Sequence, residues 1–177
     1  MPNHCHNDLY ISGPKAQIDA LLLLVGALGD EPKFDFNAVI KYPAQFAERD
    51  ADAKELDREK FQEKYGPGAS DGYNSGGYEW CSENWGTKWN AYEVERRDYD
   101  RVCITFQTAW CPPGPVIVEL HKQFPTLTLH LEYFEMGMAQ CGGFALRAED
   151  EWYEDAPWSP GIKQSEWQGE YHGHRGG

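Results

Sequence analysis

The chain has 177 residues, of which 41% are hydrophobic and 14% aromatic, so it is long enough for one globular domain with a real core and too aromatic for a disordered protein. Its 29 acidic and 16 basic residues give a formal net charge of −13, which disfavours binding to the phosphate backbone of DNA or RNA. The acidity fits either a solvated surface or a surface that complements a basic partner.

The first elements are a strand and an amphipathic helix. Residues 7–12 alternate in polarity and end at Gly13-Pro14, which is typical of a strand followed by a turn. Residues 15–28 have apolar side chains at helical spacing, and Gly29 is expected to end that helix. Residues 34–40 are short, aromatic and partly β-branched, and we expect an extended segment there.

Residues 48–77 differ in composition from their surroundings. Residues 48–65 are dominated by charged side chains with few apolar positions, which predicts a surface helix. Residues 66–77 are rich in glycine and serine, which predicts a flexible loop. We interpret the whole stretch as a charged helical and glycine-rich insertion between core elements and not as a second domain.

The second half of the chain predicts four more strands and one helix. Residues 90–97 and 101–107 are strand candidates, and the proline-rich stretch that begins at Pro112 opens a helix that ends at Pro125. Residues 126–134 alternate strictly, which predicts a strand that is buried on one side, and residues 142–148 predict an edge strand.

This order of elements predicts an α+β fold. It matches a ferredoxin-like split βαβ arrangement, in which two helices cover one face of an antiparallel sheet. Residues 1–148 are expected to form this domain, with the insertion at 48–77. Residues 149–177 are expected to form an acidic, tryptophan-containing extension whose last residues fray.

Motifs rich in tryptophan, glycine and proline connect these elements. They are Met1-Pro2-Asn3 with Cys5, Asn7, Leu9, Ile11 and Gly13; Trp85-Gly86-Thr87-Lys88-Trp89 with Ala91; Thr108-Ala109-Trp110 with Pro112 and Pro113; and Tyr133, Glu135 and Gly137 followed by Gly142-Gly143. In these motifs residues 1–148 resemble a ferredoxin-like family of small bacteriophage and plasmid proteins that includes the YubB-like plasmid proteins. At His4 that family usually has an aromatic residue. The resemblance implies a mobile-element origin and a ferredoxin-like topology, and it implies no activity.

No group of residues in the sequence has the spacing of a known catalytic or metal site. His4 and His6 flank Cys5, but no paired Cys-x-x-Cys completes a zinc site, and His172 and His174 lie near the C-terminus. We therefore expect no metal and no cofactor.

Single residues with reactive side chains have simpler interpretations. Cys111 precedes a helix start, but it is more simply a small apolar residue; a nucleophilic role would also need a base, for which the sequence offers His121 and His130 without a supporting pattern. Glu83, Glu132 and Glu135 are candidates for a carboxylate pair, although surface acids are the ordinary interpretation.

The tryptophans of the central motifs have two interpretations. Trp85, Trp89 and Trp110 either brace the sheet as structural residues, together with Gly86, Thr87, Lys88, Pro112 and Pro113, or form an exposed hot spot for a protein partner. Base stacking by such aromatics is disfavoured by the charge and by the missing RNA-recognition signature.

The sequence favours a non-enzymatic protein of phage or plasmid origin that binds and inhibits a host protein. The target class would be a nucleic-acid-binding defence complex, as in anti-CRISPR or antirestriction strategies. The expected contact residues combine acids with aromatic anchors: Glu149, Asp150, Glu151, Trp152, Tyr153, Glu154 and Asp155. The alternatives are a small enzyme or nucleic-acid-processing factor with a pocket near Trp85, Trp110 and His130, and a homodimeric structural module.

The expected location is the cytoplasm of the host cell, without direct contact to nucleic acid or membrane. The chain opens without a basic start or an apolar stretch of signal-peptide type, and its five cysteines are irregularly spaced. An odd number of irregularly spaced cysteines favours reduced thiols.

Overall fold

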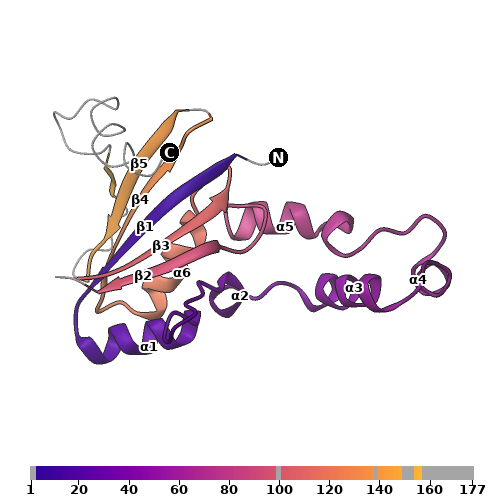
Figure 1. Cartoon of the computed structure of the whole chain (residues 1–177), viewed down its shortest axis with the longest axis horizontal. Coiled ribbons are helices and arrows are strands. Elements are labelled where there is room, and N and C mark those ends of the chain that lie inside the picture. Colours follow the sequence, from indigo (N-terminus) through magenta and orange to yellow (C-terminus); the bar gives the residue numbers. More distant parts are fainter. Residues whose placement is uncertain (1–2, 99–100, 138, 149–153, 157–177) are drawn as a thin grey trace.

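The computed structural model describes residues 3–98, 101–137, 139–148 and 154–156 (Figure 1). Its centre is an antiparallel sheet with the strand order β2-β3-β1-β4-β5-β6. The strands are β1 (His4–Ser12), β2 (Tyr92–Asp98), β3 (Val102–Ala109), β4 (Thr128–Glu135), β5 (Gln140–Leu146) and β6 (Glu154–Ala156). Helix α1 (Lys15–Val25) follows β1 in the connection that leads to β2, and helix α6 (Gly114–Gln123) connects β3 to β4. This is the split βαβ arrangement, so the ferredoxin-like prediction is confirmed.

Alternating side chains divide the sheet into two faces. Residues of β1, β3 and β4 that point toward the helices are buried, with Leu9, Ile104 and Leu131 in neighbouring positions across the strands. They pack on the buried faces of α1 and α6, which are formed by Leu21, Leu22, Val25, Val116, Ile117 and Leu120. We call this the helix face, and the opposite side of the sheet the far face.

Helix α1 is shorter than its apolar periodicity predicts. It ends at Val25 because Gly26 adopts a left-handed conformation with φ 79°, and the N–H groups of Gly26 and Ala27 bond back to the carbonyls of Leu23 and Leu22. A left-handed glycine ends a helix because it has no Cβ to clash there. The prediction that Gly29 ends the helix is therefore wrong by one turn.

The segment predicted to be extended, 34–40, contains a short helix instead. Helix α2 spans Phe36–Val39, and the carboxylate of Asp35 accepts a hydrogen bond from the N–H of Asn37 at 3.0 Å. An aspartate in this position caps a helix start, and this local signal outweighs the β-branched character of the segment. Phe34 and Phe36 remain in the core, edge-to-face with Phe106.

The predicted surface helix of the insertion is two helices. Helix α3 spans Ala44–Glu55 and has no buried residue, and α4 spans Arg58–Tyr65. The break falls at Leu56, after which Asp57 caps α4 by accepting the N–H of Lys60. Together with the 3-10 helix η1 (Tyr73–Ser75), these helices form a projection that extends away from the sheet (Figure 1). We call residues 44–76 the arm.

The return half of the arm, predicted as a flexible loop, is fixed to α3 at several points. The carboxylate of Asp50 accepts hydrogen bonds from the backbone of Tyr73 at 2.8 Å and from the Tyr42 hydroxyl at 3.1 Å. A Cβ on Gly72 would lie 2.0 Å from the carbonyl oxygen of Phe46, so only glycine fits this approach. The glycines of this loop thus reflect close packing against α3 as well as backbone flexibility.

The two ends of the arm meet at its base. The Tyr42 ring packs against Trp80 and Trp85, with ring centroids 5.6 Å and 5.9 Å apart, and a Cβ on Gly77 would lie 2.0 Å from the Tyr42 hydroxyl. Gly77 begins α5 (Gly77–Asn84), a helix that the sequence analysis did not predict and that carries Trp80 toward the core.

Strand β5 is not the edge of the sheet as predicted. Residues Gly143, Phe144 and Ala145 pair with Ala156, Asp155 and Glu154 of β6. Part of the expected C-terminal extension therefore belongs to the sheet. None of the helices in the described residues is long and apolar enough to cross a bilayer.

Candidate functional site on the far face

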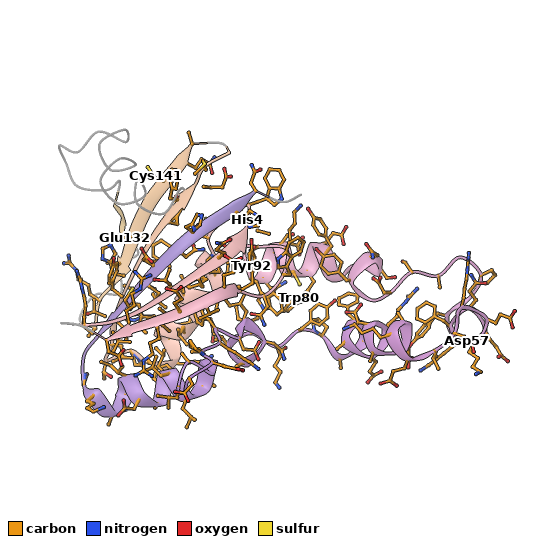
Figure 2. All side chains as sticks on the ribbon, in the orientation of Figure 1. His4, Asp57, Trp80, Tyr92, Glu132 and Cys141 are labelled. Atoms are coloured by element: carbon orange, nitrogen blue, oxygen red, sulfur yellow. The ribbon has the colours of Figure 1, made fainter. Side chains whose placement is uncertain are left out.

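The far face gathers titratable side chains from the central strands. The strand register places Asp8 of β1 directly opposite Glu132 of β4, and Tyr10 directly opposite His130. On the other side of Asp8, Thr105 of β3 donates its hydroxyl proton to Asp8 Oδ1 at 2.8 Å. Asp8 and Glu132 are both buried, with exposed fractions of 9% and 6%. Figure 2 shows Glu132 among the strands, far from Trp80 at the base of the arm.

Burial dominates the electrostatics of this group. It raises the pKa of Glu132 to about 7; Asp8 opposite raises it further and Arg101 opposes the rise. Burial also lowers the pKa of His130, with Arg101 as the second cause. His130 Nε2 lies 3.7 Å from Glu132 Oε1. Near neutral pH the site therefore holds a neutral His130 beside a Glu132 carboxyl group that is partly protonated and partly ionised.

Aromatic and cationic side chains extend the group along the strands. The guanidinium of Arg101 lies over the Tyr10 ring at 4.5 Å, and the Tyr10 and His130 rings have centroids 5.9 Å apart. On β5, Gly143 lies opposite Glu132, and a Cβ there would lie 2.9 Å from the Leu131 carbonyl oxygen, so the close approach of the two strands at this point requires glycine. The arrangement can hold or transfer a proton and can take up a cationic group.

A shallow depression of about 270 Å³ continues the far face toward β2. It shares Thr105 with the carboxylate pair, and its other lining residues are His6, Glu93, Glu95, Arg97, Phe106 and Gln107. Arg97 donates to Glu95 at 2.8 Å, so the lining charges are partly paired within the depression.

The histidines near the N-terminus do not converge on a metal. His4 Nδ1 hydrogen-bonds the Tyr92 hydroxyl at 2.7 Å, and Figure 2 shows the two side by side. No group of three or more potential ligands occurs among the residues that the structure describes. His172 and His174 lie outside those residues.

The two tryptophan motifs form a structural joint. Thr87 is buried, and its hydroxyl donates to the carbonyl of Ala109 at 2.9 Å and accepts the N–H of the same residue at 3.2 Å. Gly86 has φ 79°, and a Cβ on it would lie 2.8 Å from Pro115 Cδ. The first tryptophan motif is thereby fixed to the second, which links the end of β3 to the start of α6.

The individual tryptophans have different environments. Trp85 is in the core and donates its indole N–H to the carbonyl of Ile40 at 2.9 Å. Trp89 is 37% exposed, and Trp110 is partly buried. The helix face contains Trp85 and the far face contains His130, so the structure does not bring them together into the expected pocket with Trp110.

Other motif residues form a buried polar network on the helix face. The Asn7 side chain donates to the carbonyl of Cys5 and to Thr108 Oγ1, both at 2.9 Å, and Thr108 donates to the carbonyl of Cys111 at 2.7 Å. Glu135 is buried nearby in register with Cys5 and accepts the N–H of Gly137 at 2.8 Å. The hydrogen bonds of Asn7 and Thr108 join the start of β1 to the end of β3, and Glu135 fixes the turn that follows β4.

The remaining expected site residues are distributed as follows. Glu149, Asp150, Glu151, Trp152 and Tyr153 lie outside the described residues, whereas the backbone of Glu154 and Asp155 lies in β6. Cys111 is exposed, Glu83 is exposed on α5, and the His121 Nδ1 atom is buried and has no hydrogen-bond partner among the described residues. Asp8, the actual partner of Glu132, was missed, although its place on the polar side of a predicted strand was visible.

The fold and the far face define a ferredoxin-like α+β domain with an acidic surface. Residues 84–173 match the sequence model of a family described as the ferredoxin-like domain in Api92-like protein, over half of the chain. The chain therefore belongs to the Api92-like family. The match reaches residue 173, beyond the expected limit at residue 148, and it leaves the arm outside.

Among solved structures, the chain is similar to the crystal structure of a protein api92 from Yersinia pseudotuberculosis. It has 11% sequence identity and a TM-score of 0.49, and the similarity covers 90% of this chain and 100% of that one. No curated protein matches the sequence. The expected relation to YubB-like phage and plasmid proteins stays a prediction.

Proposed function

We propose that the protein is a non-enzymatic binding protein that engages a basic surface of a partner protein through its acidic C-terminal part. The observation that carries the proposal is the uneven charge: residues 149–177 contain seven of the 29 acidic residues and only two of the 16 basic ones. Five of these acids fall in residues 149–155, around Trp152 and Tyr153. Acids beside aromatic anchors are suited to an interface with a basic protein.

The structure supports this proposal through the position of β6. Because residues 154–156 pair with β5, the acidic segment is joined to the sheet at a defined edge. An acidic segment that begins at this edge would increase the association rate with a basic partner.

The finer version of the proposal names the kind of partner. A host protein with a basic nucleic-acid groove has the complementary charge, and a phage or plasmid protein that occupies such a groove would inhibit it in the cytoplasm of the host cell. The family assigned here gives no activity, so this version depends on the charge argument and on the resemblance described above.

The test compares two neutralised variants of the full chain. In the first, Glu149→Gln, Asp150→Asn, Glu151→Gln, Glu154→Gln and Asp155→Asn are combined. The matched control carries Glu31→Gln, Glu48→Gln, Glu55→Gln, Glu59→Gln and Glu63→Gln, all at exposed positions elsewhere. The tagged wild-type chain first recovers a partner from cell extract, and binding is then measured with that purified partner over a salt series.

We expect the first variant to bind at least about tenfold more weakly and to lose most of the salt dependence, because opposite charges across an interface mainly raise the association rate. The control should keep the affinity within about twofold. Equal binding by both variants would contradict the role of residues 149–155.

A second candidate function is acid–base chemistry at the far face. The specific observation is Glu132, a carboxyl group with a pKa of about 7 beside His130. Glu132→Gln separates the two candidates, because it would abolish a reaction that uses this proton and leave binding through residues 149–155 intact.

A further inference from the structure

A lysine held between aromatic rings lies where the two tryptophan motifs meet. The ammonium of Lys88 lies 5.0 Å from the centroid of the Trp110 ring and 5.6 Å from that of Tyr78. Among the described residues it forms no ion pair with a carboxylate, a property that it shares with Lys33, Lys41 and Lys54 but not with Lys15, Lys60, Lys64 and Lys122. The rings thus hold a positive charge in place without neutralising it.

Two large aromatic side chains are exposed here: Tyr78, which contacts the Lys88 ammonium, and Trp89, the next residue along the chain. Tyr78 and Trp89 are 39% and 37% exposed, two of the few large hydrophobic side chains that are exposed in the described residues. Trp110 has its indole Nε1 atom buried without a hydrogen-bond partner among those residues. Exposed tyrosine and tryptophan beside a cation are the residue types that dominate the energy of protein interfaces.

The backbone under this surface is fixed before any partner binds. Thr87, next to Lys88, makes two hydrogen bonds to Ala109, next to Trp110. Trp110 itself has φ 71°, an uncommon conformation for a residue with a side chain, and its N–H donates to the carbonyl of Asn3 at 3.0 Å. A surface that is already ordered loses little conformational entropy when a partner binds.

We propose that Tyr78, Lys88, Trp89 and Trp110 form a docking site for an acidic segment of a partner protein. One carboxylate of the segment pairs with the Lys88 ammonium, and an adjacent apolar or aromatic side chain lies against Trp89. Charge complementarity selects this occupant, because a basic segment would place like charge beside a cation that no carboxylate in the described residues offsets.

This site is separate from the proposed function, in which acids of this chain meet a basic partner. The two surfaces differ in sign and in location: Tyr78 belongs to α5 at the base of the arm, and residues 154–156 lie at the β5 edge of the sheet. A chain with both would bring an acidic and a basic protein surface together.

The experiment uses nuclear magnetic resonance of the full chain labelled with ¹⁵N. Each tryptophan gives a separate indole N–H signal, which is followed while the unlabelled peptide Glu-Glu-Trp-Glu-Glu is added. The salt concentration is about 150 mM, so that charges farther away than about 8 Å are screened. The control peptide is Gln-Gln-Trp-Gln-Gln, and the protein variants are Lys88→Gln, Lys88→Arg, Trp89→Gln and the matched Lys41→Gln at another exposed lysine.

We expect the acidic peptide to shift the Trp89 and Trp110 signals in the low millimolar range or below. Lys88→Gln and Trp89→Gln should each weaken binding at least about fivefold, whereas Lys88→Arg, which keeps the charge, and Lys41→Gln should not. If Lys88→Gln disturbs the indole signals before peptide is added, the comparison is made with Trp89→Gln and Lys88→Arg. The proposal is overturned by equal binding of the neutral peptide, by unchanged binding to Trp89→Gln, by shifts confined to other tryptophans, or by no binding at all.

Discussion

The two faces of the sheet are made from alternate residues of the same strands, yet they contain different chemistry. On the helix face, Leu9 lies between Ile104 and Leu131 in an apolar core. One residue earlier, on the far face, Asp8 lies between Thr105 and Glu132. Both sets are buried, but only the second can change its charge. Of these two neighbouring sets, the apolar one contributes stability that does not depend on pH, and the far-face one contributes stability that does.

Phe106→Ala should have the largest effect. The Phe106 side chain is completely buried between Phe34 and Phe36, so the variant leaves a cavity and loses about 3–5 kcal/mol of unfolding free energy. Because no titratable group is removed, we expect the same loss at pH 5 and pH 8 in urea denaturation. Leu23→Ala, at a position with 70% exposure, serves as the control and should change little. If the loss of unfolding free energy in Phe106→Ala differed between pH 5 and pH 8, the two faces would not differ in their pH dependence as described.

Glu132→Gln should stabilise the protein in a manner that depends on pH. The pKa of Glu132 is raised from 4.5 to about 7 in the folded protein, so the folded state binds more protons than the unfolded state between these values. Stability is therefore lost as the pH rises from about 4.5 to 7. The variant avoids this loss and should gain at most about 3 kcal/mol at pH 8 and almost nothing at pH 4.

Chemical denaturation at several pH values, with Glu31→Gln at an exposed position as control, checks this expectation. A Glu132→Gln variant that is less stable than the wild type at pH 8 would show that the ionised carboxylate has a partner that compensates its burial.

Thr108→Val should cost about 2 kcal/mol, since it removes the acceptor of the Asn7 side chain and the donor to the Cys111 carbonyl within a buried network. Thermal unfolding should show this loss equally at pH 5 and pH 8. Asn74→Ala on the exposed part of the arm is the matched loss of a polar side chain and should affect the melting temperature less. Equal effects would mean that the network contributes nothing beyond ordinary surface hydrogen bonds.

Thr105→Val should have the smallest effect, about 1 kcal/mol, because it removes a single hydrogen bond to Asp8 on the far face. The double variant with Glu132→Gln measures the coupling between the two positions. If the two changes add without coupling, Thr105, Asp8 and Glu132 do not act as one group and the far-face site is narrower than described.

Much of the fold could be predicted from local patterns. The alternation of residues 126–134 and the spacing of Val116, Ile117 and Leu120 indicate β4 and α6 directly. Helix α5 was missed because its glycine start and its tryptophans give no helical periodicity, and its position depends on contacts of Trp80 and Trp85 with Tyr42.

The candidate site was less accessible to sequence reasoning, for a physical reason. Glu132 was noted as a polar residue on a strand, but its burial and its partner Asp8 depend on the pairing of β1 with β4, which are more than a hundred positions apart. The contact of Thr87 with Ala109, 22 positions apart, likewise depends on the fold and not on the local sequence. The order of residue types along the chain indicates that a motif exists. Only the pairing register of the strands shows which residues of the motif are in contact.

The meeting of the two ends of the arm has an evolutionary consequence. Tyr42 and Gly77 are in contact at its base, and residues 44–76 between them contribute no strand to the sheet. A single insertion or deletion at this point would add or remove the whole arm without rerouting the rest of the chain. The family match begins at residue 84 and so includes neither the arm nor β1 and α1.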